Sequence, residues 1–361
     1  MLRASRAPEG SFPSIVACPG RLDNFLFPQR FPVKETGRSP ARICTGFSLL
    51  FRWKSRIMKG ITLIREAFFT MNSNLVFYGT GAAEAIPSPF CSCRVCQFAR
   101  ERGGREERAR SMFRVNEELS VDLGPDAVLR AMRFGDLTGL RHVLVTHTHL
   151  DHFCYDMMEV RSMSRDAKEP LVFWLTDEAF RAVECFRESR FVGEETGRLV
   201  AKGAVEFRRL EYGKTETVAG LRVTPLRGNH KGQVGENSAN YLLELPDGRT
   251  LYYGLDTGWY LPETFEALRG RALDLLVSEC TFGLTPDRGE EPEGHLDAFS
   301  CERLIRALFD QGTLTAASHV YLTHINHYTS TGEELAAWLA GRSFPCPVTL
   351  AWDGMRIGEE A

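Results

Sequence analysis

Short apolar runs that end in a polar or glycine-containing segment recur along residues 74–361 and predict the strands of a buried sheet. Asp177 is placed to cap a helix that continues past Phe180 toward Arg187, and residues 298–310 predict another helix. Polar residues that follow such strands should lie together at an edge of the sheet. The predicted strands cover residues 142–146, 171–175, 221–226, 251–255 and 320–323, and residues 348–357 predict a closing pair of edge strands.

The most informative segment follows the first of these strands and reads His147-Thr148-His149-Leu150-Asp151-His152. Three imidazoles and a carboxylate on one tight loop would repel and desolvate one another unless a cation held them. The alternation lets His147 and His149 point one way while Asp151 and His152 point the other, which suits two metals better than one. The alternative is a solvated histidine-rich loop, which requires this spacing to arise by chance directly after a strand.

Three further candidate ligands follow later predicted strands. His230 follows residues 221–226 within a Gly-Asn loop, Asp256 follows residues 251–255, and His324 follows residues 320–323. Imidazoles and carboxylates suit zinc, manganese or iron, and a bridging carboxylate can hold two cations about 3.5–4 Å apart. Water between two such cations loses a proton near neutral pH and becomes a nucleophile. Taken singly, His230 or His324 is more often a surface or hydrogen-bonded histidine than a ligand.

The H-x-H-x-D-H spacing, followed by the later His, Asp and His, resembles the signature of the metallo-β-lactamase-fold hydrolases over roughly residues 74–357. The resemblance implies an α/β fold with four layers, an αβ/βα sandwich. It also implies the distribution of the ligands and a catalytic part for Asp151. In that distribution His147, His149 and His230 hold one metal, Asp151, His152 and His324 hold the second, and Asp256 bridges them.

A second cluster, Cys91-Ser92-Cys93-Arg94-Val95-Cys96, precedes the histidine-rich loop. Three thiols can supply three corners of a tetrahedral zinc site, which needs a fourth ligand. Our candidate is His327, three residues after His324. The alternatives are three reduced cysteines in a loop or a redox pair. The nearby Gly79-Thr80-Gly81 is not a dinucleotide-binding loop, because the third glycine is missing and Pro87 blocks the helix that should follow.

The combination of the two clusters is similar to the phosphoribosyl cyclic phosphate phosphodiesterases of bacterial phosphonate breakdown and related hydrolases. That resemblance supports His327 and implies a catalytic role for His295, in Gly294-His295-Leu296, which can protonate a departing alkoxide or bind the phosphoryl group. The alternative for His295 is a solvent-exposed histidine at a helix start. Coenzyme PQQ synthesis protein B has a similar opening, which keeps a role in cofactor biosynthesis open.

We therefore expect a dinuclear metal-dependent hydrolase that cleaves a small phosphodiester, cyclic ones included. Its expected cofactors are two divalent metals in the cleft, zinc or manganese, and one structural zinc. Hydrolysis of a carboxylic ester, lactone or thioester is an alternative, because the same hydroxide attacks carbon or phosphorus. A biosynthetic or carrier protein that binds a metal or small molecule without hydrolysis is another.

Charge divides the chain into two parts. Residues 1–70 hold 12 of the 44 Lys and Arg residues but 4 of the 47 Asp and Glu residues, and we expect a basic, mostly disordered extension. Its composition also resembles an organelle transit peptide. Residues 71–361 predict one hydrolase domain, whose 32 basic and 43 acidic residues give a formal net charge of −11. Such an acidic domain argues against long nucleic acids as partners. We expect a small, phosphorylated substrate instead.

Cysteine usage and hydropathy bear on the compartment. Ten cysteines, three of them clustered, favour reduced thiols with a metal site over a disulfide framework, so we expect a cytoplasmic protein. No stretch of the sequence reaches 18 apolar residues, so we expect no membrane contact. The oligomeric state stays open, a homodimer included.

Overall fold

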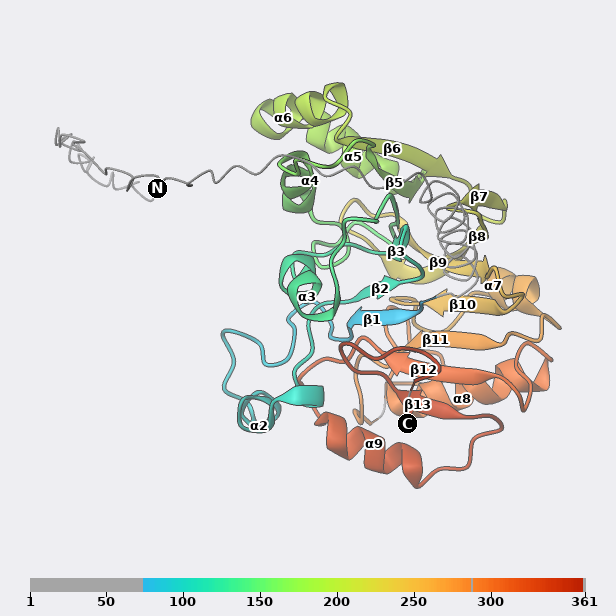
Figure 1. Ribbon diagram of the computed structural model, residues 1–361. Helices are drawn as coiled ribbons and strands as arrows, with labels where there is room; N and C mark the ends of the chain where they lie inside the picture. The colour runs from blue at the N-terminus through green and yellow to red at the C-terminus, as the bar shows by residue number, and fades with distance from the viewer. Residues whose placement is uncertain (1–73, 287, 360–361) are drawn as a thin grey trace, which may run out of the picture. The chain divides into compact units, whose positions relative to one another are not determined.

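The computed structural model describes residues 74–286 and 288–359, apart from the side chains of residues 190–192, so the expected disordered extension at 1–70 lies outside the described residues. Two mixed β-sheets form the centre of the fold (Figure 1). The six strands of the first lie in chain order: β1 (Val76–Gly79), β2 (Met112–Arg114), β3 (Leu119–Val121), β4 (His142–Leu144), β5 (Leu171–Thr176) and β6 (Val205–Leu210). The seven strands of the second also lie in chain order: β7 (Glu216–Val218), β8 (Leu221–Lys231), β9 (Asn237–Glu244), β10 (Thr250–Gly254), β11 (Leu275–Glu279), β12 (His319–Thr323) and β13 (Val348–Leu350).

Both sheets begin antiparallel and become parallel further along the chain. Strands β1 to β3 are antiparallel and β3 to β6 are parallel, while β7 to β10 are antiparallel and β10 to β13 are parallel. Parallel strands need long crossover connections, which are usually helical. The carboxyl ends of parallel neighbours meet at one edge of a sheet, so the loops that follow them lie side by side.

Helices cover the outer face of each sheet. The helices that pack on the six-stranded sheet are α3 (Ala127–Phe134), α4 (Tyr155–Ser162), α5 (Phe180–Glu188) and α6 (Arg190–Ala201). Those on the seven-stranded sheet are α2 (Arg94–Arg102), α7 (Pro262–Leu268), α8 (Ala298–Asp310) and α9 (Gly332–Ala340), and a short 3₁₀ helix, η1 (Gly104–Glu106), follows α2. The predicted four-layer αβ/βα sandwich is therefore confirmed (Figure 1).

The space between the sheets is filled by alternate side chains of both. Along β10, Leu251 and Tyr253 pack between the sheets while Tyr252 packs under the outer helices, as the two-residue period of a strand requires. Each such buried side chain contributes about 1.5–3 kcal/mol of transfer free energy. The hydroxyl of Tyr241 donates to the carbonyl of Val145 at 2.5 Å, which joins the two sheets where the histidine-rich loop begins.

Most predicted elements lie within two residues of their expected bounds, and helix 298–310 begins and ends as predicted. One prediction that affects the site was wrong. The strand expected at 221–226 continues as β8 to Lys231, with an irregular register between Arg227 and Lys231, so His230 lies in a strand and not in a loop. The irregularity lets the strand continue through Gly228 and Asn229, which look like a turn in the sequence.

Two other predictions of local structure also need correction. Asp177 does not cap α5, which begins at Phe180 after Ala179; instead the Thr176 hydroxyl accepts from the Ala179 N–H at 3.2 Å. In the C-terminal segment, β13 is an edge strand, but Met355 accepts from the Phe77 N–H of β1 in the other sheet and Ile357 donates to the Leu75 carbonyl just before β1, so these residues make no strand pair with β13.

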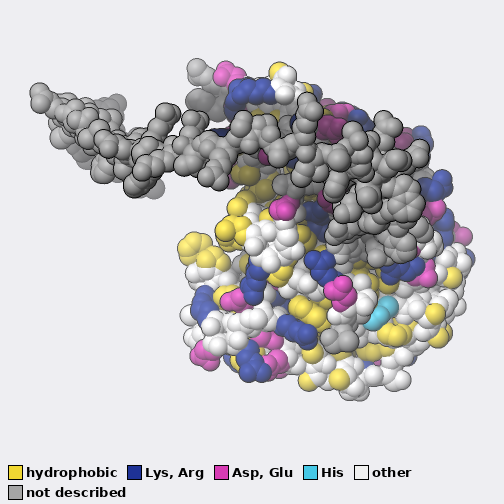
Figure 2. All heavy atoms as spheres, viewed as in Figure 1, with side chains coloured by type: hydrophobic (Ala, Val, Ile, Leu, Met, Phe, Trp, Pro, Cys, Tyr) yellow, Lys and Arg dark blue, Asp and Glu magenta, His cyan; other side chains and the backbone are white. Residues whose placement is uncertain are grey.

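The visible surface mixes both signs of charge. On the face drawn in Figure 2, the Lys and Arg side chains of the described residues are interspersed with Asp and Glu side chains. No helix within residues 74–286 and 288–359 is both long and apolar enough to cross a membrane.

Candidate metal centre

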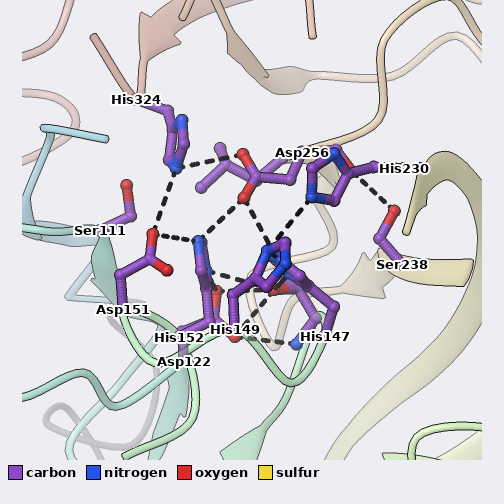
Figure 3. A network of polar contacts seen from close by, with 12 residues as sticks. Ser111, Asp122, His147, His149, Asp151, His152, His230, Ser238, Asp256 and His324 are labelled. Atoms are coloured by element: carbon purple, nitrogen blue, oxygen red, sulfur yellow. Dashed lines mark hydrogen bonds and ion pairs between the residues drawn. The ribbon is translucent and has the colours of Figure 1, made fainter. Parts of the chain in front are cut away.

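The seven predicted ligands come from both sheets and converge at the carboxyl ends of the strands (Figure 3). The loop after β4 brings four of them, and β8 brings His230. Asp256 follows β10 and His324 follows β12, two strands that each pair with β11. Their ligand atoms form two groups, each with all its atoms within 4.8 Å of one another: His147, His149 and His230, and Asp151, His152, Asp256 and His324.

In the first group, three imidazole nitrogens face one point. His149 Nδ1 lies 2.9 Å from His147 Nε2 and 3.3 Å from His230 Nε2. Burial and the neighbouring His152 keep the pKa of His147 well below its usual value, so this imidazole is neutral. Neutral imidazole nitrogens that converge in this way are the donor set of a divalent transition metal.

In the second group, Asp256 occupies the position between the two sets of ligands. Its Oδ2 lies 2.9 Å from His152 Nε2 and 3.4 Å from His147 Nε2, and its Oδ1 lies 3.1 Å from His324 Nε2. Asp151, which we expected to act in catalysis as well, has its Oδ2 2.9 Å from His152 Nε2 and 3.9 Å from His324 Nε2. Asp256 therefore contacts a histidine of each group, as a bridging ligand would.

Unsatisfied buried atoms test whether these residues fit a metal. His152 Nε2, His324 Nε2 and Asp256 Oδ1 are buried, and although they lie close to other atoms of the cluster, none of the three makes a hydrogen bond. Burial would raise the pKa of Asp256, but the imidazoles of His324 and His152 hold it well below its usual range, so the carboxylate is ionised. Leaving such atoms unpaired costs free energy that a cation would offset. The buried His and Asp cluster thus forms a site for a divalent metal.

A buried carboxylate that the sequence analysis missed, Asp122, orients two of the histidines. It directly follows β3, is fully buried, and accepts from His152 Nδ1 at 2.7 Å. The Thr146 hydroxyl lies 2.9 Å from Asp122 Oδ2 and 3.0 Å from His147 Nδ1, so it donates to the first and accepts from the second. Because the protons are held on Nδ1, the Nε2 lone pairs of His147 and His152 face the metal site.

A second missed carboxylate, Glu279 at the end of β11, plays the corresponding part on the other sheet. Glu279 is fully buried and lies 2.9 Å from His295 Nδ1. The Thr281 hydroxyl donates to Glu279 Oε2 at 2.5 Å and lies 3.0 Å from His324 Nδ1. Glu279 also accepts from the backbone N–H groups of Thr257 and Gly258, at 2.7 and 2.9 Å, and so fixes the loop that carries Asp256.

His295 is the predicted catalytic residue outside the ligand set, and it lies at the cluster. Its ring centre is 4.6 Å from that of His230 and 5.8 Å from that of His324. Burial alone would lower its pKa, but the carboxylates of Glu279 and Asp256 raise the pKa of His295 to about 9. These carboxylates favour the protonated imidazole. The alternative of a solvent-exposed histidine is wrong, because only 23% of the side chain is exposed.

The site also holds backbone strain. Asp122, Asp256 and His324 have φ angles of 61°, 46° and 60°, a left-handed conformation that residues other than glycine rarely adopt. Such residues cost on the order of 1–3 kcal/mol each and collect at functional sites. Asp122 and His324 directly follow a strand, and Asp256 lies two residues after the end of β10.

A third buried carboxylate, Glu236, lies outside the ligand cluster and fixes the histidine-rich loop by hydrogen bonds to Thr148. Its Oε1 accepts from the Thr148 N–H at 2.8 Å and from the Thr148 hydroxyl, and its Oε2 accepts from the Val234 N–H at 3.1 Å. Thr148 lies between the two ligands His147 and His149. The connection between β8 and β9 therefore fixes the loop that follows β4.

The cysteine cluster and His327 come together as predicted, although they are far apart in the sequence. His327 Nδ1 lies 3.3 Å from Cys93 Sγ and 3.4 Å from Cys96 Sγ, and the ligand atoms of all four residues lie within 4.8 Å. Burial opposes ionisation of Cys93, but hydrogen bonds, first of all from His327, lower its pKa to about 6. A Cys₃His cluster with a ready thiolate is a donor set for zinc.

The missed residues share a weak signal in the sequence. Asp122 and Glu279 each follow or end a short apolar strand, as the predicted ligand Asp256 does. A carboxylate in that position could have been included as a candidate. Glu236 lies in a polar hairpin and has no such signal, because its role depends on a contact with a loop 88 residues earlier.

Comparisons with known proteins agree with this geometry. A family model described as the beta-lactamase superfamily domain matches residues 119–325. Among solved structures, a diphosphatase of the PhnP family is 20% identical, with a TM-score of 0.56 over 80% of this chain and 98% of that one. Zn²⁺-bound PqqB from Methylobacterium extorquens is 18% identical, with a TM-score of 0.59 over 79% and 99%.

A third structure, the metallo-beta-lactamase fold protein YhfI from Bacillus subtilis, is 18% identical, with a TM-score of 0.55 over 78% of this chain and 98% of that one. At such identities the likeness establishes the fold. A search of curated proteins finds no match.

Proposed function

We propose that this protein cleaves a small phosphodiester. The chain belongs to the β-lactamase superfamily. Together with the buried His and Asp metal site, this makes it a metal-dependent hydrolase. In this proposal His147, His149 and His230 would hold one divalent cation, Asp151, His152 and His324 would hold a second, and Asp256 would serve both. When bound, the cations supply a Lewis acid for the phosphoryl oxygens and lower the pKa of water so that it can attack.

The observation that carries the proposal is the pair formed by His295 and Glu279 beside the ligand cluster. Glu279 accepts from His295 Nδ1, so the Nε2 proton of the imidazolium is free for the substrate. A protonated imidazole can bind the negative charge of a phosphodiester and then protonate the leaving alkoxide. A neutral carboxylic ester has no such charge in the ground state, which favours the phosphodiester. One structural neighbour is described as a diphosphatase, which supports attack at phosphorus rather than at carbon.

Each of the other polar residues has a positioning role in this proposal. Asp122 and Thr146 orient His147 and His152, and Thr281 orients His324. They hold the ligands in place before substrate binds, so that little reorganisation is needed during the reaction. The four residues Cys91, Cys93, Cys96 and His327 hold a structural zinc. The substrate is small and phosphorylated, and it is hydrolysed in the cytoplasm.

A substrate panel tests the proposal. The protein, loaded with zinc or manganese and with its metal content measured, is assayed on bis(4-nitrophenyl) phosphate, 4-nitrophenyl phosphate and 4-nitrophenyl acetate. We expect the diester to have the highest kcat/KM. His319→Gln, in a histidine of β12 that stacks on Tyr321 outside the cluster, should leave the rates unchanged. Preference for the acetate would favour an esterase, and absence of turnover at full metal loading would favour a non-hydrolytic role in binding or cofactor biosynthesis.

A further inference from the structure

A cavity of about 640 Å³ lies at the free edge of the seven-stranded sheet, away from the metal ligands. It is bounded by β13, by α9 and by the segment from the end of α2 through η1. Figure 1 shows α9 beside β13, the last strand of this sheet. None of the residues that line the cavity belongs to either histidine group or to the cysteine cluster. Its volume is in the range of sites for small organic molecules.

Arginines outnumber carboxylates in the lining of this cavity, which contains Arg102, Arg105 and Arg108 but only Glu106 and Glu333. Both carboxylate oxygens of Glu106 accept from backbone N–H groups at the start of α9, those of Gly332 at 2.7 Å and Glu333 at 2.9 Å. The carboxylate of Glu333 pairs with Arg102 at 2.7 Å. Glu106 stays charged but forms no ion pair with Arg105 or Arg108, and its charge acts on Arg108 only from farther away.

Neither of these two arginines has a carboxylate within 4.0 Å among the residues that the structure describes. Arg108 is 2% exposed and uses Nη1 to donate to the Thr80 hydroxyl at 2.9 Å and to the Ala351 carbonyl at 2.7 Å. Asp353 and Glu106 act on it only from farther away, and burial lowers the pKa of Arg108. Arg105 lies over the ring of Trp352, 3.7 Å from its centre. A buried guanidinium without a paired anion is costly unless a ligand supplies one.

The opposite wall of the cavity is apolar. Leu339 is buried, and Val348 and Leu350 on β13 are half-buried, so all three present carbon surface to the cavity. Ala336, one turn of α9 before Leu339, adds a small side chain and leaves space beside it. A ligand that fills this space would bury apolar surface at about 25 cal/mol per Å².

We propose that this cavity binds a small organic anion whose carboxylate or phosphate contacts Arg105 and Arg108 and whose apolar body covers Leu339, Val348 and Leu350. The planar forks of arginine match the paired oxygens of both head groups. The apolar wall selects against inorganic anions. The proposal is independent of the reaction at the metal site, because it depends on different residues.

Calorimetric titration of the full-length, metal-loaded chain with decanoate tests the proposal. We expect one saturable site per chain, and about tenfold weaker binding or worse for Arg105→Gln, because a hydrogen bond to a charged group is lost. Ala336→Trp fills the cavity from an exposed position of α9 and should abolish binding without unfolding the protein. Arg222→Gln, in an arginine of β8 that pairs with Glu244, is the matched control and should bind normally.

Three further ligands identify what is recognised. Decyl phosphate in place of decanoate shows which of the two head groups binds more tightly. Decylamine, with the same chain and the opposite charge, should not bind, and inorganic phosphate should bind at least tenfold more weakly than decanoate. The proposal would be overturned if decylamine or inorganic phosphate bound as tightly as decanoate. It would also be overturned if neither Arg105→Gln nor Ala336→Trp weakened the binding of decanoate.

Discussion

Two buried carboxylates, Asp122 and Glu279, determine how the histidines of the metal site are protonated. Each is fully buried, each lies at the end of a strand, and each is joined to one histidine directly and to another through a threonine hydroxyl. The carboxylate accepts a hydrogen bond from one ring nitrogen, which keeps its proton, and leaves the other nitrogen for the metal or the substrate. In each sheet, therefore, a buried carboxylate and a threonine hydroxyl orient two histidines of the site.

Asp122→Asn should weaken metal binding while the fold is kept. An amide is a poorer acceptor for His152 Nδ1–H than a carboxylate, and it can present its own N–H to that nitrogen and favour the wrong tautomer. We expect the affinity of the cleft for zinc to fall about 10- to 100-fold, measured by competition with a chromophoric chelator. Asp136→Asn, in an exposed aspartate that accepts from Thr138, is the control. An unchanged affinity for Asp122→Asn would mean that the carboxylate has no part in orienting the ligands.

His295→Ala should affect catalysis according to the leaving group. A general acid contributes about 10²- to 10⁴-fold to the rate when the leaving group is a poor one, and little for 4-nitrophenolate, which leaves without a proton. We therefore expect a large loss of kcat on an alkyl phosphodiester and a small loss on bis(4-nitrophenyl) phosphate. The metal content should stay at the wild-type value. Equal losses on both substrates would indicate that His295 binds the phosphoryl group or holds Asp256 and does not act as an acid.

At the scale of elements, the sequence contains enough to predict the places where strands end, but not every contact between distant elements. The histidine-rich loop, Asp256 and His324 each follow an apolar run, and the structure places each within three residues of the end of a strand. His230 was expected in a loop after the strand because Gly228 and Asn229 resemble a turn. Backbone pairing with β9 carries β8 through this segment, and such pairing between strands cannot be seen in local composition.

Contacts between elements explain the remaining omissions. Glu236 becomes important because the β8–β9 connection reaches the Thr148 N–H, and Asp122 becomes important because β3 lies next to β4. Neither neighbour relation follows from local residue patterns. The predicted capping of α5 by Asp177 was wrong because of a local contact, not a distant one. The hydroxyl of the neighbouring Thr176 accepts from the Ala179 N–H at the start of the helix. The sequence was enough to predict the metal ligands. The carboxylates that orient these ligands could not be predicted, because their contacts depend on which strands and loops are neighbours in the fold.

The cysteine cluster gives a prediction at this scale, because it joins the start of α2 to the segment between β12 and α9. Wild-type protein should contain about three metals per chain, and Cys93→Ala or His327→Ala should contain two, since a tetrahedral site rarely survives the loss of a ligand. Metal analysis after gel filtration measures this. Cys185→Ala, in an exposed cysteine of α5, should keep all three. If His327→Ala also keeps three, the fourth ligand is a different group.

At the scale of the whole molecule, the metal site joins the two sheets. Each group of candidate ligands takes residues from the loop after β4 in the six-stranded sheet and from strands or loops of the seven-stranded sheet. Between the sheets lies the apolar layer that contains Phe113 and Tyr253, whose ring centres are 5.4 Å apart. The same interface that buries the core therefore brings the ligands together.

Removal of the metals should therefore destabilise the whole molecule and not only inactivate it. A cation that binds the folded cluster and not the unfolded chain stabilises the fold by about 2.7 kcal/mol at a concentration 100 times its Kd. For a domain of this size, this corresponds to a rise in Tm of roughly 5–10 °C. Thermal unfolding with excess zinc and with a chelator should show that difference. The control is a triple variant. His149→Ala and His324→Ala remove one ligand from each group, and Cys93→Ala removes the structural site. The chelator should have little effect on the Tm of this protein. An undiminished effect in this triple variant would show that the stabilising metal binds elsewhere, and equal Tm values for wild-type protein in zinc and chelator would show that the sheets hold the cluster together without it.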